Sequence, residues 1–172
     1  MSVRTGARTG TVLLVLLAVG TWAAGSGSAA ESVSAFEKLK ALAGRWEGRH
    51  SDGSPARAVY QVLSGGSVVA EFLADETGAD MITVYHLDQD DLRLTHYCSS
   101  KNQPRMKATS ISADTSAIHF DFVDATNLAK PSDGHMWSLK VRLLEEDHIE
   151  QEWTWREGDQ ETREIIRLTR VR

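Results

Sequence analysis

The feature that most constrains this chain is a long series of short segments in which apolar and polar residues alternate. From residue 45 onward these segments run for roughly five to nine residues and are separated by Gly, Asp, Ser or Pro. Alternation with a period of two is typical of β-strands that bury one face. We expect about ten strands, at residues 45–50, 57–63, 67–74, 80–87, 92–98, 104–111, 117–123, 135–143, 147–155 and 162–171.

The connections between these segments decide the architecture. Most are tight turns without room for crossover helices, which favours an antiparallel meander. A meander of this size closes into an up-and-down barrel, because closure removes the unpaired edges. The predicted fold class is therefore all-β, an antiparallel barrel preceded by a short helix at residues 34–43, with Ser34 as its N-cap and Gly44 at its end. The longest connection, residues 124–134, is a candidate rim loop.

The N-terminus has the layout of a signal peptide. Arg4 and Arg8 precede an apolar run at residues 11–22, and Ser28 and Ala30 offer the small residues of a cleavage site. The apolar run is shorter than the roughly 20 residues that a bilayer span needs. We expect residues 1–30 to be removed and residues 31–172 to form a single exported domain, periplasmic or secreted. An uncleaved membrane anchor is the alternative.

Charge and cysteine content narrow the classes of partner. Of 19 basic and 24 acidic residues, two basic ones lie in residues 1–30, so the mature charge is 17 − 24 = −7. An acidic exported domain is a poor nucleic-acid binder and has little attraction to anionic lipid, so we expect neither a nucleic-acid partner nor stable membrane insertion after cleavage. Cys98 is the single cysteine, which excludes an internal disulfide.

Residues 92–98 place ligand-type side chains beside the core. Leu92, Leu94, His96 and Cys98 share one parity, so one pleated strand points all four to the same side. A four-residue turn at 88–91 pairs this strand with the preceding one. The resulting cross-strand pairs are Leu87 with Leu92, Tyr85 with Leu94, Thr83 with His96 and Met81 with Cys98.

The same parity argument brings polar groups inward from other strands. His135 and Trp137 point inward with Leu139, and Gln151 points inward with Trp153 and Trp155. A barrel of about ten strands is too wide for its own side chains to fill, so a cavity is expected. The tryptophans would form a flat apolar wall for a ring-shaped or acyl ligand.

Gly44, Arg45 and Trp46 follow the short helix and open the first strand, and this start resembles that of the calycins, the lipocalins and fatty-acid-binding proteins. The resemblance implies that Trp46 closes the barrel floor beneath an arginine of the last strand. Arg170 is the first candidate for that arginine and Arg167 the second, in a cation–π contact. Segments such as residues 65–67, 85–87, 94–98 and 102–106 resemble exported bacterial lipocalin-like proteins over most of residues 40–171, which implies a fold without an activity.

Two further hypotheses assign a cofactor to the barrel. The nitrobindin-like haem barrels are similar in size and strand count, and that resemblance implies a haem ligated by a histidine near the C-terminus. This chain has no histidine after His148, so it departs from the haem-binding pattern at that position. His96, Cys98 and His135 could instead bind zinc or copper, if the strands bring them together. Otherwise His96 is a hydrogen-bonded core histidine and Cys98 a buried small residue.

A catalytic reading uses the same residues. Cys98 could act as a nucleophile with His96 or His135 as its base, in a hydrolase or isomerase. The sequence contains no nucleophile elbow and no metal-ligand motif such as HExxH or CxxC to favour chemistry. We therefore expect no catalytic residues and no cofactor.

The leading prediction is an exported binding protein for a small, mostly apolar ligand, which could carry an acidic group. Arg105 would anchor such an acid if it points inward, and otherwise is a surface arginine paired with a carboxylate. Asn127 could gate the rim loop, or simply be solvated there. We expect His50, His86, His119 and His148 to be solvated. The predicted ligand-binding residues are Tyr85, His96, Cys98, Arg105, His135, Trp137, Gln151 and Trp153.

Overall fold

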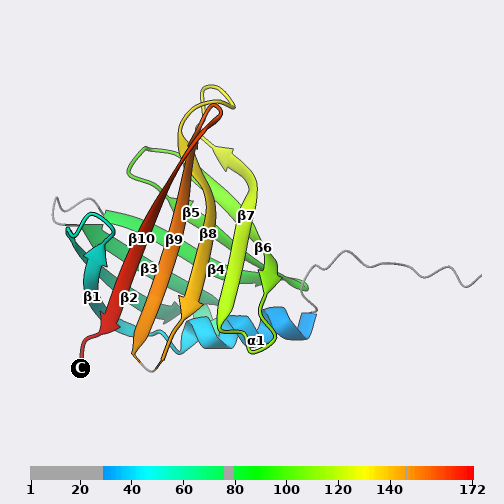
Figure 1. The fold of residues 1–172 in the computed structure, drawn as a ribbon. Coiled ribbons are helices and arrows are strands. Elements are labelled where there is room, and N and C mark those ends of the chain that lie inside the picture. Colours follow the sequence, from blue (N-terminus) through cyan, green and yellow to red (C-terminus); the bar gives the residue numbers. More distant parts are fainter. Residues whose placement is uncertain (1–28, 76–79, 146) are drawn as a thin grey trace, which may run out of the picture.

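A computed structural model describes residues 29–75, 80–145 and 147–172 as one helix packed on a closed antiparallel barrel (Figure 1). The strand order around the barrel is β1-β10-β9-β8-β7-β6-β5-β4-β3-β2, so each strand pairs with its neighbours in sequence and β1 closes on β10. The elements are α1 Ala29–Lys40, β1 Gly44–His50, β2 Pro55–Leu63, η1 Ser64–Gly66, β3 Val68–Asp75, β4 Asp80–Asp88, β5 Asp91–Tyr97, β6 Gln103–Ile111, β7 Ala117–Thr126, β8 His135–Leu143, β9 His148–Glu157 and β10 Gln160–Arg170.

The predicted all-β barrel is confirmed. The strand bounds agree closely, because the apolar residues of the alternating pattern are the ones that face the core. Inward residues on every strand belong to one buried cluster that includes Leu73, Leu94, Phe120, Leu139 and Leu168. The turn at 88–91 sets the register between β4 and β5 as expected. The observed pairs are Leu87 with Leu92, Tyr85 with Leu94 and Thr83 with His96.

Helix α1 closes one end of the barrel, and it differs from the predicted helix. Figure 1 shows it lying across the end opposite the long β7–β8 connection. It buries Ala35, Phe36 and Leu39. The prediction of residues 34–43 was wrong at both ends: Ser34 lies inside the helix, because the amphipathic pattern extends back to Ala29.

Trp46 and Arg170 lie together at this closed end. The guanidinium carbon of Arg170 is 4.4 Å from the Trp46 ring centre, and the Trp46 indole N–H donates to the carbonyl of Leu42 at 2.8 Å. Arg170 also donates to the carbonyls of Ala41 and Ala43, each at 2.8 Å. The arginine therefore joins β10, β1 and the end of α1, as the calycin resemblance implies for such a pair.

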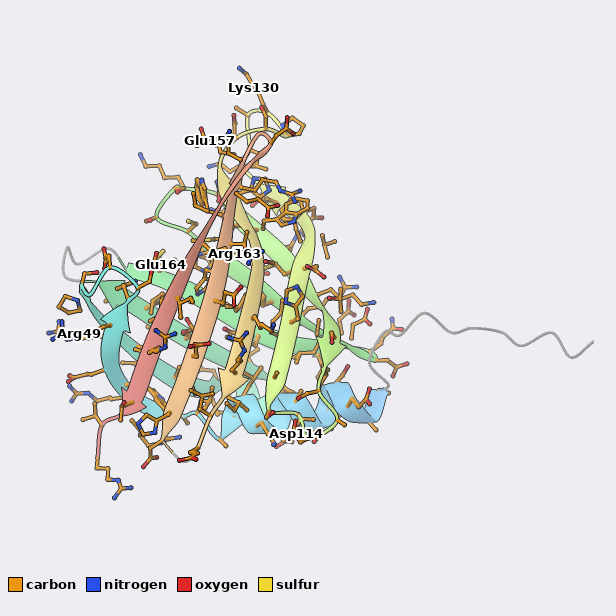
Figure 2. All side chains as sticks on the ribbon, in the orientation of Figure 1. Arg49, Asp114, Lys130, Glu157, Arg163 and Glu164 are labelled. Carbon is orange, nitrogen blue, oxygen red and sulfur yellow. The ribbon has the colours of Figure 1, made fainter. Side chains whose placement is uncertain are left out.

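The outer surface of the barrel differs from one side to the other. On β8, β9 and β10, outward side chains form ion pairs, such as Arg167 with Glu150 at 2.9 Å. On β2 to β5, a cross-strand row of apolar residues faces outward instead: Val59, Phe72, Ile82 and Tyr97. Figure 2 shows the charged side chains, including Arg163, along the outside of the first of these two faces.

Two strand ends and one ladder depart from the prediction. β7 continues to Thr126, so the first three residues of the predicted rim loop are paired with β6. Cys98 lies just beyond β5, in a turn where its N–H bonds the carbonyl of Asn102, and its predicted pairing with Met81 is not part of the ladder. The ladder between β8 and β9 shifts by one residue between Met136 and Ser138.

The register shift in β8 corrects the predicted side-chain directions there. Leu139 faces inward opposite Trp153, and Met136 lies opposite the inward position of Trp155. The extra residue reverses the alternation. His135 therefore lies opposite Arg156, on the outward face of β9, and not on the inward side that the parity of Leu139 predicted. His135 and Trp137 are thus turned away from the barrel centre occupied by Gln151.

The predicted signal peptide falls almost entirely outside the described residues. Helix α1 begins at Ala29, one residue before the predicted cleavage point after Ala30. Among the described residues, no helix has the length and hydropathy needed to cross a membrane.

Candidate functional site

The centre of the barrel holds a buried carboxylate, Glu71, that accepts hydrogen bonds from three strands. Tyr60 of β2 donates to it at 2.9 Å and Tyr85 of β4 at 2.8 Å. The Gln151 amide of β9 donates both to Glu71 and, at 2.7 Å, to the Tyr60 hydroxyl. The Trp153 indole N–H donates to the Gln151 carbonyl oxygen at 3.1 Å. Each member thus has a partner, as buried polar groups require.

The burial of this network shifts the acidity of its members. Glu71 is 0% exposed, and burial raises its pKa, against hydrogen bonds from Gln151, Tyr85 and Tyr60 that favour the charged form. Burial, followed by the charge of Glu71, raises the pKa of both tyrosines well above their ordinary value. The network therefore presents phenol groups and not phenolates at neutral pH.

Sequence reasoning identified Tyr85, Gln151 and Trp153 but missed Glu71 and Tyr60. The signal was available, because Val69, Glu71 and Leu73 alternate with one parity in an otherwise apolar strand. A glutamate is rarely buried unless it is paired, so an inward Glu71 required partners from facing strands. The structure supplies them.

His96 lies beside this network on β5, between Thr83 and Trp153. Its Nδ1 is 3.0 Å from the Thr83 hydroxyl, and its ring centre is 4.7 Å from that of Trp153. Burial lowers the pKa of His96 from 6.5 to about 4, so the ring is neutral near neutral pH. Its Nε2 is buried with no hydrogen-bond partner among the described residues.

Arg105, Cys98 and His50 do not join these residues in the way the sequence allowed. Arg105 faces outward with its side chain 53% exposed, and it binds Asp124 through two hydrogen bonds of 2.5 and 2.7 Å. It lines an outer pocket of about 260 Å³ and is not an inward anion anchor. Cys98 is half-buried in its turn. His50, predicted to be solvated, has a side chain only 10% exposed and lies 2.6 Å from Glu164, because it faces inward near the barrel mouth.

A pocket of about 540 Å³ lies at the loop end of the barrel, against the predicted site residues His135 and Trp137. Phe122 stacks on Trp137 with ring centres 4.8 Å apart, and it contacts His135 in a tilted arrangement with ring centres 4.6 Å apart. The β7–β8 connection contributes Leu128 and Pro131 to its wall. The wall is thus mainly aromatic and aliphatic, with one buried imidazole.

Two of the charged side chains that line this pocket, Asp124 and Arg156, are already paired. The Arg156 guanidinium lies 3.4 Å from the Trp137 ring centre and donates to Glu161. Asp124, on the opposite rim, binds Arg105. Lys130 stands at the tip of this end with its side chain pointing away from the barrel (Figure 2). The pocket therefore offers apolar surface with little unpaired charge.

Reciprocal hydrogen bonds hold the loops around the pocket. Asn102 in the β5–β6 loop donates to the carbonyl of Gly134 at 2.9 Å, and Asn127 in the β7–β8 loop donates to the carbonyl of Lys101. The N–H of Gly158, in the β9–β10 turn, bonds the carbonyl of Ser132 at 3.0 Å. The β7–β8 loop is therefore tied on both sides. Asn127 is bonded in this clip and is not a free gate.

A smaller pocket of about 210 Å³ lies at the barrel mouth between β10 and β9. Met136, Trp153, Trp155 and Thr162 line it, and these residues occupy inward ladder positions. The Trp153 ring in its wall also contacts His96 in a tilted arrangement. Apart from Arg105 and Cys98, the predicted site residues therefore divide between the barrel centre and the pockets at the loop end.

His96, Cys98 and His135 do not form a metal-holding group among the described residues. His96 lies on Thr83 and Trp153, whereas His135 lies in the aromatic cluster with Phe122 and Trp137. Within residues 29–75, 80–145 and 147–172, no group of three or more His, Cys, Asp or Glu side chains is arranged to hold a metal ion.

Comparisons with known proteins bear on the fold alone. No family model and no curated protein matches the chain. Among solved structures, the crystal structure of Rv2717c from M. tuberculosis is similar, with a TM-score of 0.54 and 18% sequence identity over 80% of this chain and 98% of that one. At this identity the likeness supports the barrel architecture and carries no function.

Replacing Glu71 by leucine should be strongly destabilising. The change leaves the Tyr60 and Tyr85 hydroxyls and the Gln151 amide buried without their acceptor, at a cost of about 3–5 kcal/mol in the free energy of unfolding. Urea denaturation measures this loss. Glu47→Leu, at an exposed position of β1, should change stability by less than about 0.5 kcal/mol. Equal stability of the two variants would contradict a central role for Glu71.

His96 should make folding weaker in acid. Its folded-state pKa of about 4 lies below the ordinary 6.5, so between these values the unfolded chain binds a proton that the folded chain does not. The contribution of neutral His96 to the free energy of unfolding is complete above pH 6.5 and is lost as the pH falls toward 4. From pH 7 to pH 4.5 we expect a loss of about 2 kcal/mol that is absent in His96→Phe.

Urea denaturation of both proteins at the two pH values measures the difference, and other titrating groups cancel in the comparison. His119→Phe, at a half-exposed position of β7, serves as the matched control and should lose stability as the unsubstituted protein does. An acid loss of the same size in His96→Phe would show that His96 is not its source.

Proposed function

We propose that this chain is an exported binding protein for a small, mostly apolar ligand, held at the loop end of the barrel. The observation that carries the proposal is the pocket of about 540 Å³ whose aromatic wall includes a buried imidazole. Concave apolar sites with a few placed polar groups are typical of small-molecule binding. The reciprocal loop hydrogen bonds support it further, because a preformed site costs less ordering on binding.

The arrangement of the barrel centre supports a site at the loop end over one deeper inside. Glu71, Tyr60, Tyr85 and Gln151 bond one another, so a ligand there would have to replace hydrogen bonds that already exist. At the loop end, His135 lines an open pocket and retains a buried nitrogen without a partner among the described residues, as His96 also does beside the central network. Of the residues first predicted to bind ligand, His135 and Trp137 are thus the ones we assign to the principal site.

Binding of a metal or haem remains a second candidate. His135 bonds a backbone carbonyl through Nδ1 and leaves Nε2 unpaired, which is how metal-ligating histidines are commonly held. An absorbance scan and metal analysis of the purified protein would separate this candidate from the binding of an organic molecule.

A charge placed in the loop-end pocket should weaken the binding of an apolar probe. Leu128→Glu puts a carboxylate among apolar side chains, so the affinity for the neutral dye Nile red should fall at least about tenfold. Fluorescence titration measures it. The control is Phe72→Ser in an outer apolar groove on β2 to β4. Loss of binding in the control alone would show that the dye binds in that groove, which would refute the proposed site.

Export is part of the proposal and has its own test. We expect the full chain, produced in a bacterium, to be found outside the cytoplasm with an intact mass that lacks residues 1–30. The physical reason is the basic stretch, short apolar run and small cleavage-site residues that precede Glu31. A mass that retains residues 1–30 in a membrane fraction would favour the anchor instead.

A further inference from the structure

Two buried side chains at the loop end each retain an unpaired hydrogen-bond acceptor: His135 in the wall of the pocket, and Asn102, which bonds the residue before it. We propose that the ligand of this pocket presents a neutral hydrogen-bond donor, a hydroxyl or an N–H group, on an apolar body, and not a carboxylate. The inference rests on the proposed function and specifies the class of ligand. The neutral donor replaces the acidic group that the sequence analysis allowed on the ligand.

The first acceptor is Nε2 of His135. The ring is 3% exposed, and its Nδ1 lies 2.7 Å from the backbone carbonyl of Asp133. A carbonyl only accepts, so Nδ1 must carry the proton in this contact. In the neutral imidazole the other nitrogen, Nε2, then carries a lone pair. It is buried and has no partner among the described residues.

The second acceptor is the side-chain oxygen of Asn102. This residue is 4% exposed, and its amide nitrogen donates to the carbonyl of Gly134 at 2.9 Å. The carbonyl again decides the orientation, because only the NH₂ end of the amide can face it. Oδ1 is therefore left as a buried acceptor, also without a partner in the described part of the chain.

The two side chains are linked through Gly134, because Asn102 bonds the carbonyl of this residue, which directly precedes His135. Gly134 packs closely against Trp155, since a Cβ there would lie 2.2 Å from the Trp155 ring. The bonded loops fix both side chains before any ligand arrives. Buried unpaired acceptors cost free energy, so a group that donates to them gains more than it would at an exposed site.

The charges around the pocket argue against an ionised ligand. A carboxylate would set its lone pairs against those of His135 and Asn102. Arg105 and Arg156 already bind Asp124 and Glu161, and Lys130, which also lines the pocket, points away from the barrel (Figure 2). An ammonium group would supply donors, but both of those carboxylates are taken by the arginines. A neutral donor satisfies the acceptors without burying an unpaired charge.

Isothermal titration with four matched probes tests the inference on the mature protein, after treatment with a chelator. The probes are 1-naphthol, 1-methylnaphthalene, 1-naphthoate and 1-naphthylmethylammonium, which share the ring and differ in the polar group. We expect 1-naphthol to bind at least about tenfold more tightly than each of the others, because it alone is a neutral donor.

Variants then locate the preference. His135→Phe keeps a ring but removes the acceptor, so the affinity for 1-naphthol should fall to that for 1-methylnaphthalene, which itself should be little changed. Asn102→Leu should reduce the preference in part. His119→Phe is the control for the histidine change. Asn127→Gly removes the reciprocal loop bond without removing a buried acceptor, and it keeps the positive φ of 62° at that position.

The outcomes separate the inference from the function on which it rests. Equal binding of 1-naphthol and 1-methylnaphthalene, or tightest binding of either ionised probe, overturns the donor ligand and leaves the apolar binding site standing. A preference for 1-naphthol that survives in both His135→Phe and Asn102→Leu also overturns it. Absence of binding by all four probes, together with failure of the Nile red titration, overturns both proposals.

Discussion

The buried carboxylate of Glu71 is the interaction on which the rest of this barrel depends. A ring of ten strands encloses more space than aliphatic side chains fill. Glu71 on β3 draws donors from β2, β4 and β9 into that space, so that opposite walls are joined by hydrogen bonds. An unpaired carboxylate there would be costly, and the same cost makes the paired arrangement specific.

This central network occupies the middle of the barrel, because Tyr60, Tyr85 and Gln151 bond Glu71. The pocket that we propose to bind the ligand lies instead at the loop end, away from helix α1 and the Trp46–Arg170 contact. At that end the strands are irregular. The β6–β7 ladder shifts after Arg105 and the β8–β9 ladder after Met136. These shifts turn Phe122, Trp137 and His135 into one aromatic wall under the β7–β8 loop.

The candidate site was only partly predictable from sequence. Parity along β5 and β9 correctly put His96 and Gln151 inside, and the same reasoning applied to β3 would have found Glu71. It failed for His135, because a single inserted residue reverses the alternation and leaves no mark in the hydrophobic pattern. For Arg105 the sequence argument left both directions open, although parity decides between them: Met106 and Ala108 are buried on β6, so Arg105 faces outward, where it binds Asp124.

The sequence by itself determined the class of fold, the ten strands, the tight β4–β5 turn and the inward face of most strands, because these follow from local alternation and turn residues. Only the tertiary structure decided which inward polar groups meet, where the ladders shift and which acceptors stay unpaired. Those properties depend on contacts between residues distant in sequence, such as Glu71 with Gln151 and Asn102 with Gly134. A local pattern carries no record of which strands will face each other across a closed barrel.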